Sequence, residues 1–181
     1  NRNIPEKYLP LKFKGIHQSG KDNDDVKKMS IRNCAMPQVP QGIGEILKNI
    51  EILIVRFSGV KSITKFNLQQ FPKLTHLDLC GNELESLPAD LFEFTVNIEQ
   101  VYFSQNKLKF IGAELLDDLP NLQIAYFLDN ENINYFFNEG YERRGINTLK
   151  TLKEKIRLDC KLPSESSDDE EASSSESEDK K

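Results

Sequence analysis

The stretch that decides the fold is LTHLDLCGNELESL, residues 74–87. Leucines stand at its first, fourth, sixth, eleventh and fourteenth positions, and Asn82 stands at its ninth. Leu77 and Leu79 alternate with other residues, a pattern that predicts a short strand with one buried face. The side-chain amide of Asn82 can then donate to backbone carbonyls of the following turn, which would otherwise be buried without a partner.

This spacing recurs every 24 residues in both directions along the chain. Copies begin near residues 26, 50, 74, 98 and 122, and after Asn130 the pattern slips by one residue to Ile133 and Phe136. Cys34 and Ser58 take the place of the asparagine in the first two copies. One copy leaves an apolar face that only stacking against further copies can bury, so the sequence predicts an α/β protein built of stacked repeats. We expect a short curved solenoid of about five repeats, with a parallel sheet on its concave face.

The second half of each copy supplies apolar residues for the convex wall of such a solenoid. Leu91, Phe92 and Phe94 are expected to form part of an internal phenylalanine stack. Cys34 is expected to point into the core.

The repeats, residues 26–144, need residues that cover both ends. Residues 1–25 are expected to form an N-terminal cap, a strand containing Leu9, Leu11 and Phe13 followed by a polar turn. Residues 145–162 have apolar side chains at helical spacing opposite lysines, which predicts a capping helix. The alternative is a helix that grips a partner or a membrane. The apolar side chains that this helix would turn toward the core are Ile146, Leu149, Leu152 and Ile156.

Charge is concentrated at the C-terminus. The chain has 24 basic and 29 acidic residues, and residues 163–181 hold eight of the acidic residues against two lysines. The rest is close to neutral, so no nucleic-acid partner is expected. No membrane span is expected either, because no apolar run approaches the roughly 20 residues that cross a bilayer. Residues 163–181 are expected to be a disordered acidic tail. It is either a solvating segment or a kinase substrate at Ser166, Ser167, Ser173 and Ser175.

The three cysteines, Cys34, Cys80 and Cys160, form neither a disulfide framework nor a C-x-x-C pair for zinc or redox chemistry. Cys80 falls at an outward strand position, where its thiol could form an intermolecular disulfide or be a small half-buried residue. The chain begins at Asn1 without a leader pattern, so either a leader has been removed or the sequence is a fragment.

With Pro88 after Leu87 in the run LPADLF, the copies resemble the typical extracellular class of leucine-rich repeats, which includes Toll-like receptor ectodomains. The segment Gly15 to Ile43 further resembles secreted leucine-rich-repeat proteins of flies and midges, some of them immune-related. The resemblance implies a secreted recognition protein. Two features depart from it: the acidic tail, and the absence of a cysteine-rich C-terminal cap. Cys160 therefore lacks the disulfide partner that the resemblance implies and could pair with another chain.

An intracellular or nuclear adaptor is the alternative to secretion. Acidic-tailed nuclear leucine-rich phosphoproteins share the layout of a short solenoid followed by a tail that engages basic proteins. The resemblance of the repeats to the extracellular class favours secretion.

Outward strand positions of successive copies should line up about 4.8 Å apart on the concave face. Arginines lie at the N-terminal end of this face, and tyrosines with aliphatic residues lie at its C-terminal end. Tyr and Arg are enriched at binding hot spots. A protein ligand with an acidic segment next to a protruding apolar side chain would therefore match this face. The alternative is an ordinary solvated surface. The predicted partner-binding residues are Arg32, Arg56, Asp78, Tyr102, Ile124, Tyr126 and Leu128.

A catalytic role is not expected. No patterned nucleophile or metal ligand stands beside His17 or His76, the two histidines. His76, Asp78 and Cys80 would share one face of a strand, but an open sheet offers no oxyanion site and excludes no water. The sequence predicts a non-enzymatic protein-binding module without a cofactor or metal.

Overall fold

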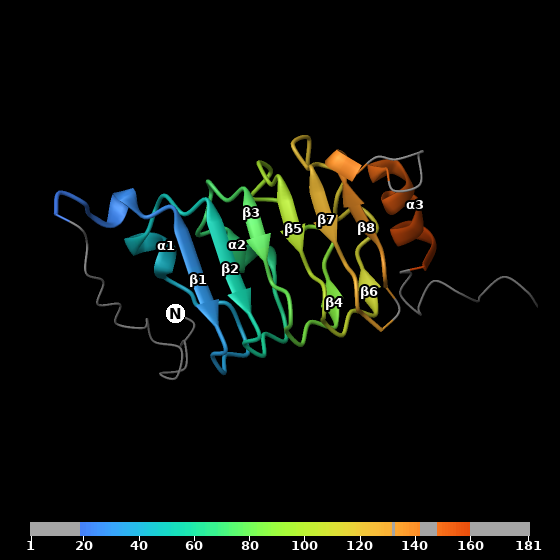
Figure 1. Cartoon of the computed structure of the whole chain (residues 1–181), viewed down its shortest axis with the longest axis horizontal. Coiled ribbons are helices and arrows are strands. Elements are labelled where there is room, and N and C mark those ends of the chain that lie inside the picture. Colours follow the sequence, from blue (N-terminus) through green and yellow to red (C-terminus); the bar gives the residue numbers. More distant parts are fainter. Residues whose placement is uncertain (1–18, 132, 142–147, 160–181) are drawn as a thin grey trace, which may run out of the picture.

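The repeats stack into one sheet in the computed structural model, which describes residues 19–131, 133–141 and 148–159 (Figure 1). The strand order is β1-β2-β3-β5-β7-β8, and the first five strands run parallel. Successive strands pair at steps of 24 residues, so the solenoid predicted from the repeat spacing is confirmed. The parallel strands are β1 (Lys28–Arg32), β2 (Ile52–Arg56), β3 (His76–Asp78), β5 (Gln100–Tyr102) and β7 (Ile124–Tyr126).

Alternate side chains of each strand point into the core. Leu77 and Leu79 are fully buried, as the alternation of the repeat predicts. Burial of such a side chain stabilises a fold by about 1.5–3 kcal/mol, so this row of residues is a main source of stability. The equivalent buried residues of the other copies are Leu53, Val55, Val101, Phe103, Ala125 and Phe127.

An asparagine ladder joins successive repeats. The amide of Asn82 donates to the carbonyl of Val55 in the preceding repeat (2.7 Å) and to that of Leu79 in its own (2.8 Å). Its Oδ1 accepts from the N–H groups of Ser58 (3.1 Å) and Val60 (3.2 Å). The donation by Asn82 that the sequence predicts is therefore confirmed. The amide oxygen of the same side chain also accepts hydrogen bonds from the preceding repeat. The ladder continues at Asn106 and Asn130.

One residue of each repeat, between the strand and the ladder position, has a left-handed backbone with φ between 51° and 69°. Glycine adopts this conformation freely, whereas a bulky side chain is strained in it. Phe57 is the bulky member of the row, and its ring lies over Gly81, where an added Cβ would come within 2.3 Å of it. The row is Asn33, Phe57, Gly81, Gln105 and Asp129.

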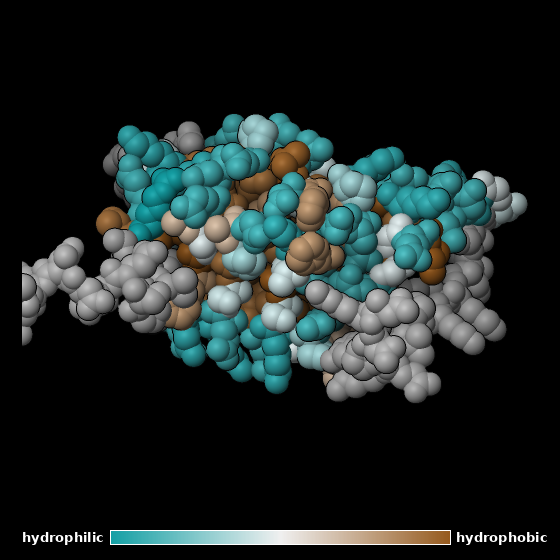
Figure 2. Space-filling view, turned by 180° about the vertical axis from the view of Figure 1, so that it is seen from behind, coloured by the Kyte–Doolittle hydropathy of each residue, from teal (hydrophilic) through white to brown (hydrophobic). Residues whose placement is uncertain are grey.

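The second halves of the repeats form the opposite side of the molecule (Figure 2). They contain α1 (Ile43–Ile46), α2 (Lys65–Leu68) and a parallel pair of short strands, β4 (Ser86–Leu87) and β6 (Phe110–Ile111).

The internal phenylalanine stack expected in these second halves is only partly correct. Leu91 and Phe92 are buried as expected, but Phe94 is 36% exposed, so its expected internal position is wrong. Thr95, 1% exposed, takes the inward place in that turn. Phe94 instead meets Phe66 at the surface, with ring centroids 6.4 Å apart.

The sheet ends in an antiparallel strand. β8 (Phe136–Asn138) pairs with β7 in the opposite direction, so Phe137 rather than Phe136 points into the core. The expectation that the repeat pattern continues through Phe136 is therefore wrong, because the chain reverses after the one-residue slip.

Beyond β8 follow η3 (Glu139–Tyr141) and α3 (Leu149–Asp159). Leu152 and Ile156 of α3 are 2% exposed and belong to the main core, as expected of a capping helix. Within the described residues, no helix is long and apolar enough to span a membrane.

At the other end of the sheet, β1 is the outermost strand described. The polar turn before it contains η2 (Asn23–Asp25), capped by the carboxylate of Asp22. The predicted strand with Leu9, Leu11 and Phe13 lies outside the described residues, as do Ile146, Cys160 and the predicted acidic tail.

The expectation that Cys34 is a core residue is wrong, because its side chain is exposed. A ladder residue reaches back to the preceding repeat, as Asn82 does to Val55. No described strand precedes β1, and the thiol of Cys34 donates instead to the carbonyl of Arg32 in its own repeat, 3.4 Å away.

Candidate functional site

The candidate site is the open face, defined as the side of the six-stranded sheet that is turned away from the core. Figure 1 looks onto it, and no described element crosses in front of its strands. On β1, Lys28, Ser30 and Arg32 are exposed. The outward residues of β2, β3, β5 and β7 are half-buried, except Asp78, which is 6% exposed.

Arg56 and Asp78 form an ion pair in the middle of the open face. Nε of Arg56 donates to Oδ2 of Asp78 at 2.6 Å, and the guanidinium makes a second contact with the same oxygen. The other carboxylate oxygen accepts from the N–H of Cys80 at 3.1 Å. The hydrogen bond to Asp78 raises the pKa of Arg56, while burial opposes this. These two predicted site residues therefore neutralise one another.

Lys28 and Arg32 supply the free positive charge of the open face. The nearby carboxylates are already engaged, Glu51 by Lys27 and Asp78 by Arg56. Among the described residues neither Lys28 nor Arg32 has an ion-pair partner, and Nε of Arg32 donates to the hydroxyl of Ser30 at 3.4 Å. The positive end of the surface thus lies on β1, next to the ion pair.

The aromatic row, defined as Tyr102, Tyr126 and Phe136, lies at the other end of the open face. Ring centroids are 5.5 Å apart for the two tyrosines and 5.6 Å apart for Tyr126 and Phe136, both pairs tilted. The Tyr102 hydroxyl donates to Oε1 of Gln100 at 2.8 Å, and the Tyr126 hydroxyl accepts from the amide of Asn138 at 2.9 Å. Burial raises the pKa of Tyr102, so its hydroxyl stays protonated. Rings in this geometry are fixed before any ligand arrives.

The remaining predicted residues, Ile124 and Leu128, are half-buried on and just after β7. They flank Tyr126 and extend the apolar end of the open face. Phe136 was missed by sequence reasoning, which placed it on the core side. The repeat spacing gives no signal for it, because β8 runs antiparallel to β7 and places Phe137, not Phe136, opposite the buried Ala125.

The line of His76, Asp78 and Cys80 does not assemble a reactive thiol. Nδ1 of His76 bonds to the hydroxyl of Thr75 at 2.7 Å, and Asp78 is held by Arg56. Burial, helped by the nearby Asp78 carboxylate, raises the pKa of the Cys80 thiol to about 12. The thiolate is the reactive form, so this environment disfavours an intermolecular disulfide through Cys80.

Comparisons with known proteins match the repeats. Residues 72–124 match the family described as leucine rich repeat. The volume-regulated anion channel subunit LRRC8D of Rattus norvegicus is 28% identical over 86 residues, which are 47% of this chain and 10% of that protein. Subunit LRRC8B of Mus musculus is 24% identical over 141 residues, 74% of this chain and 17% of that protein. The chain thus spans a small part of these relatives.

Solved structures share the fold at low sequence identity. The Toll–Spatzle complex of Drosophila superposes with a TM-score of 0.56 at 20% identity, covering 62% of this chain and 15% of that one. The leucine-rich repeat domain of APL1B gives 0.54 at 23%, covering 58% and 31%. The TLR13–ssRNA13 complex gives 0.53 at 22%, covering 56% and 14%. Residues 72–124 thus match the leucine rich repeat family, and the 24-residue spacing and the parallel sheet extend the same solenoid fold from β1 to β7.

Proposed function

We propose that this protein is a non-enzymatic recognition module that binds a protein ligand through the open face of its sheet. The aromatic row carries the proposal. Three rings from three neighbouring strands touch one another on a face that no described element covers, and two of them keep hydroxyl groups at their edges. Preformed tyrosine surfaces bind partners at a low entropic cost, which is why Tyr is enriched at hot spots.

The charge of the open face defines the kind of partner. Lys28 and Arg32 lie on β1, three strands from Tyr102 on β5, a separation of about 14 Å at about 4.8 Å per strand. An apolar or aromatic side chain of the ligand would sit on the aromatic row, and an acidic segment would extend toward β1. The ion pair between them offers hydrogen bonds without net charge.

An extracellular location and an immune-related role are part of this proposal. They are supported by the resemblance of the repeats to the typical extracellular class. An intracellular adaptor is the second candidate, favoured by the eight acidic residues between 163 and 181. The mass of the native protein without reduction, with and without thiol alkylation, separates them: a disulfide supports secretion, and three free thiols support the adaptor.

The binding site is tested by site-specific photo-crosslinking in extracts of the native source. A benzophenone amino acid replaces Tyr102 in one variant and Phe94 in another. A protein that crosslinks at position 102 but not at position 94 supports the proposal. Crosslinking at position 94 alone would place the binding surface on the other side of the molecule.

Affinity for the captured protein is then measured with paired aromatic variants. Replacing Tyr102 and Tyr126 together with alanine should weaken binding by at least about 30-fold, because hot-spot truncations cost about 2 kcal/mol or more. The matched control replaces Phe66 and Phe94, a touching pair on the other side, with alanine. Unchanged affinity in the tyrosine variant, with the fold intact by circular dichroism, would rule out the open face.

A further inference from the structure

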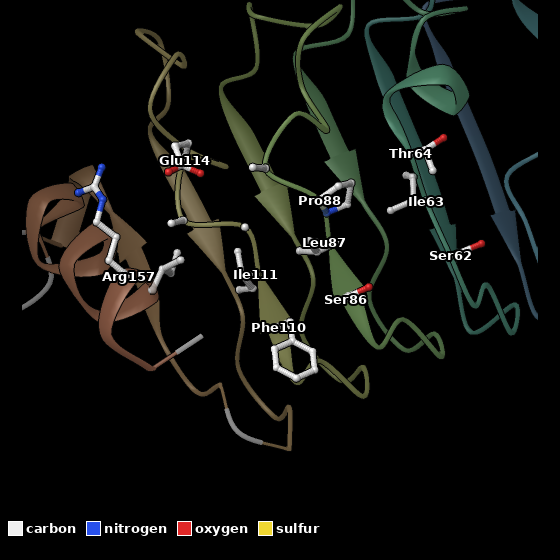
Figure 3. A pocket seen from close by; sticks show the side chains of 14 residues that line it. Ser62, Ile63, Thr64, Ser86, Leu87, Pro88, Phe110, Ile111, Glu114 and Arg157 are labelled. Carbon is white, nitrogen blue, oxygen red and sulfur yellow. The ribbon is translucent and has the colours of Figure 1, made fainter. Parts of the chain in front are cut away.

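A groove of about 740 Å³ crosses the side of the molecule opposite the open face (Figure 3). It runs from α3 across the short strands β6 and β4 toward Ile63. Leu87, Ile111 and Ile156 are buried residues that line it. Figure 2 shows this side, where apolar surface lies among hydrophilic patches. The volume is in the range of about 300–1,000 Å³ that is typical of ligand clefts, so a short peptide segment would fit.

The last turn of α3 forms one wall of this groove. Ile156 and Arg157 line it, and the helix ends at Asp159. Asp117 fixes this end of the helix, because its carboxylate binds Arg157 at 2.8 Å and Lys153 at 3.4 Å. The last described turn of the helix therefore lies at the groove.

The sequence after Asp159 matches the groove in polarity. It reads Cys160-Lys161-Leu162-Pro163, and Leu162 is the last large apolar residue of the chain. An extended residue spans about 3.3 Å, so Leu162 can reach about 10 Å from Asp159. Side chains alternate along an extended segment, so in an extended conformation positions 160 and 162 would face one way and position 161 the other.

We propose that residues 160–163 dock in this groove, with Leu162 against Ile111 and Lys161 at the rim beside Glu114. The charges are complementary, since Glu114 is exposed at the groove and has no ion pair among the described residues. Docking would start the acidic residues from Glu165 onward on the side opposite the open face. The proposed binding surface would then be left free for a ligand. This inference concerns a separate surface and does not depend on the proposed function.

Cys160 is a natural reporter of this docking, because it would face the groove together with Leu162. The full chain is treated with iodoacetamide, and the alkylation rate of each cysteine is measured by peptide mass spectrometry. Each rate is divided by the rate of the same cysteine in urea-unfolded protein. Cys34, whose side chain is exposed, provides the unprotected reference. We expect Cys160 to be protected about tenfold relative to Cys34.

Two variants should abolish this protection and one should not. Leu162→Ser removes the apolar anchor, and Ala113→Phe fills the groove, so both should raise the rate at Cys160 to that of Cys34. The matched control is Leu158→Ser, the same change at a helix residue that is 73% exposed, and it should leave the protection in place. Equal rates at Cys160 and Cys34 in the native chain would overturn the proposal. Protection that survives Leu162→Ser would overturn it as well, because another contact would then be shielding the thiol.

Discussion

Replacing Asn82 with alanine should destabilise the protein about twice as much as replacing Asn106. Oδ1 of Asn82 accepts from two backbone N–H groups, those of Ser58 and Val60, whereas Oδ1 of Asn106 accepts from that of Leu84. A buried N–H group left without a partner costs about 1–3 kcal/mol. The expected losses are therefore about 2–6 kcal/mol for Asn82→Ala and about 1–3 kcal/mol for Asn106→Ala.

The backbone carbonyls to which the two asparagine amides donate do not reverse this order. The carbonyl of Leu79 accepts from the amides of both asparagines, so it keeps one donor in either variant. The carbonyl of Val55 loses its asparagine donor only in Asn82→Ala, so it adds to the difference made by the additional N–H group that Asn82 serves.

Urea unfolding followed by far-ultraviolet circular dichroism measures the effect. With a slope of about 1–3 kcal/mol per molar urea, a loss of about 2 kcal/mol lowers the midpoint by roughly 1 M. Asn97→Ala is the matched control, since Asn97 is exposed, and it should change the free energy of unfolding by no more than about 0.5 kcal/mol. The reasoning is refuted if Asn82→Ala costs no more than Asn106→Ala, or if both behave like the control.

Three further results are expected at Gly81, Leu79 and Cys80. Gly81→Ala should cost about 1–2 kcal/mol from its left-handed backbone alone, and more from the clash of the new Cβ with the Phe57 ring. Adding Phe57→Gly removes the ring and should recover the part of the loss that the clash causes. Thermal unfolding of the single and double variants checks this, and strictly additive effects would contradict it. Leu79→Ala should cost about 2–5 kcal/mol in urea unfolding, and a loss like that of a surface change would mean that the site is not core. The raised pKa of Cys80, about 12 against an ordinary 9.0, contributes stability that is complete below pH 9 and is lost as the pH rises toward 12. At mildly alkaline pH Cys80 should accordingly be alkylated much more slowly than Cys34 in the folded protein, and equal rates would contradict its burial.

The repeat positions were predictable because one period fixes them. A step of 24 residues places Leu53, Leu77 and Val101 in register, and the structure pairs them in that way. The donating role of Asn82 was predictable, since the carbonyl groups of a buried turn need a donor, but its acceptance from the preceding repeat was not foreseen.

The ends of the array were not predictable from the period, because a repeat describes only residues that have neighbours on both sides. Cys34 lacks a preceding described strand and is exposed, while Phe136 lies where the chain has turned back. Both errors came from extending the pattern to a position where its physical cause is missing.

The candidate site was predictable in its positions but not in its contacts. Outward positions follow from the alternation of the strand, so Tyr102 and Tyr126 were correctly expected to be neighbours. The ion pair of Arg56 and Asp78 was not foreseen, because the two residues are not opposite one another. Arg56 aligns with Cys80 in the repeat, and the long guanidinium side chain reaches diagonally to the carboxylate.

The direction of the asparagine ladder has a consequence for how the protein is made. Asn82 completes hydrogen bonds of the turn that contains Ser58 and Val60, so that turn depends on a residue synthesised later. During translation the backbone groups of each such turn therefore bond to water until the next repeat emerges and its ladder residue replaces the water. The repeat at the growing end therefore gains its last intramolecular hydrogen bonds one repeat later than it is made.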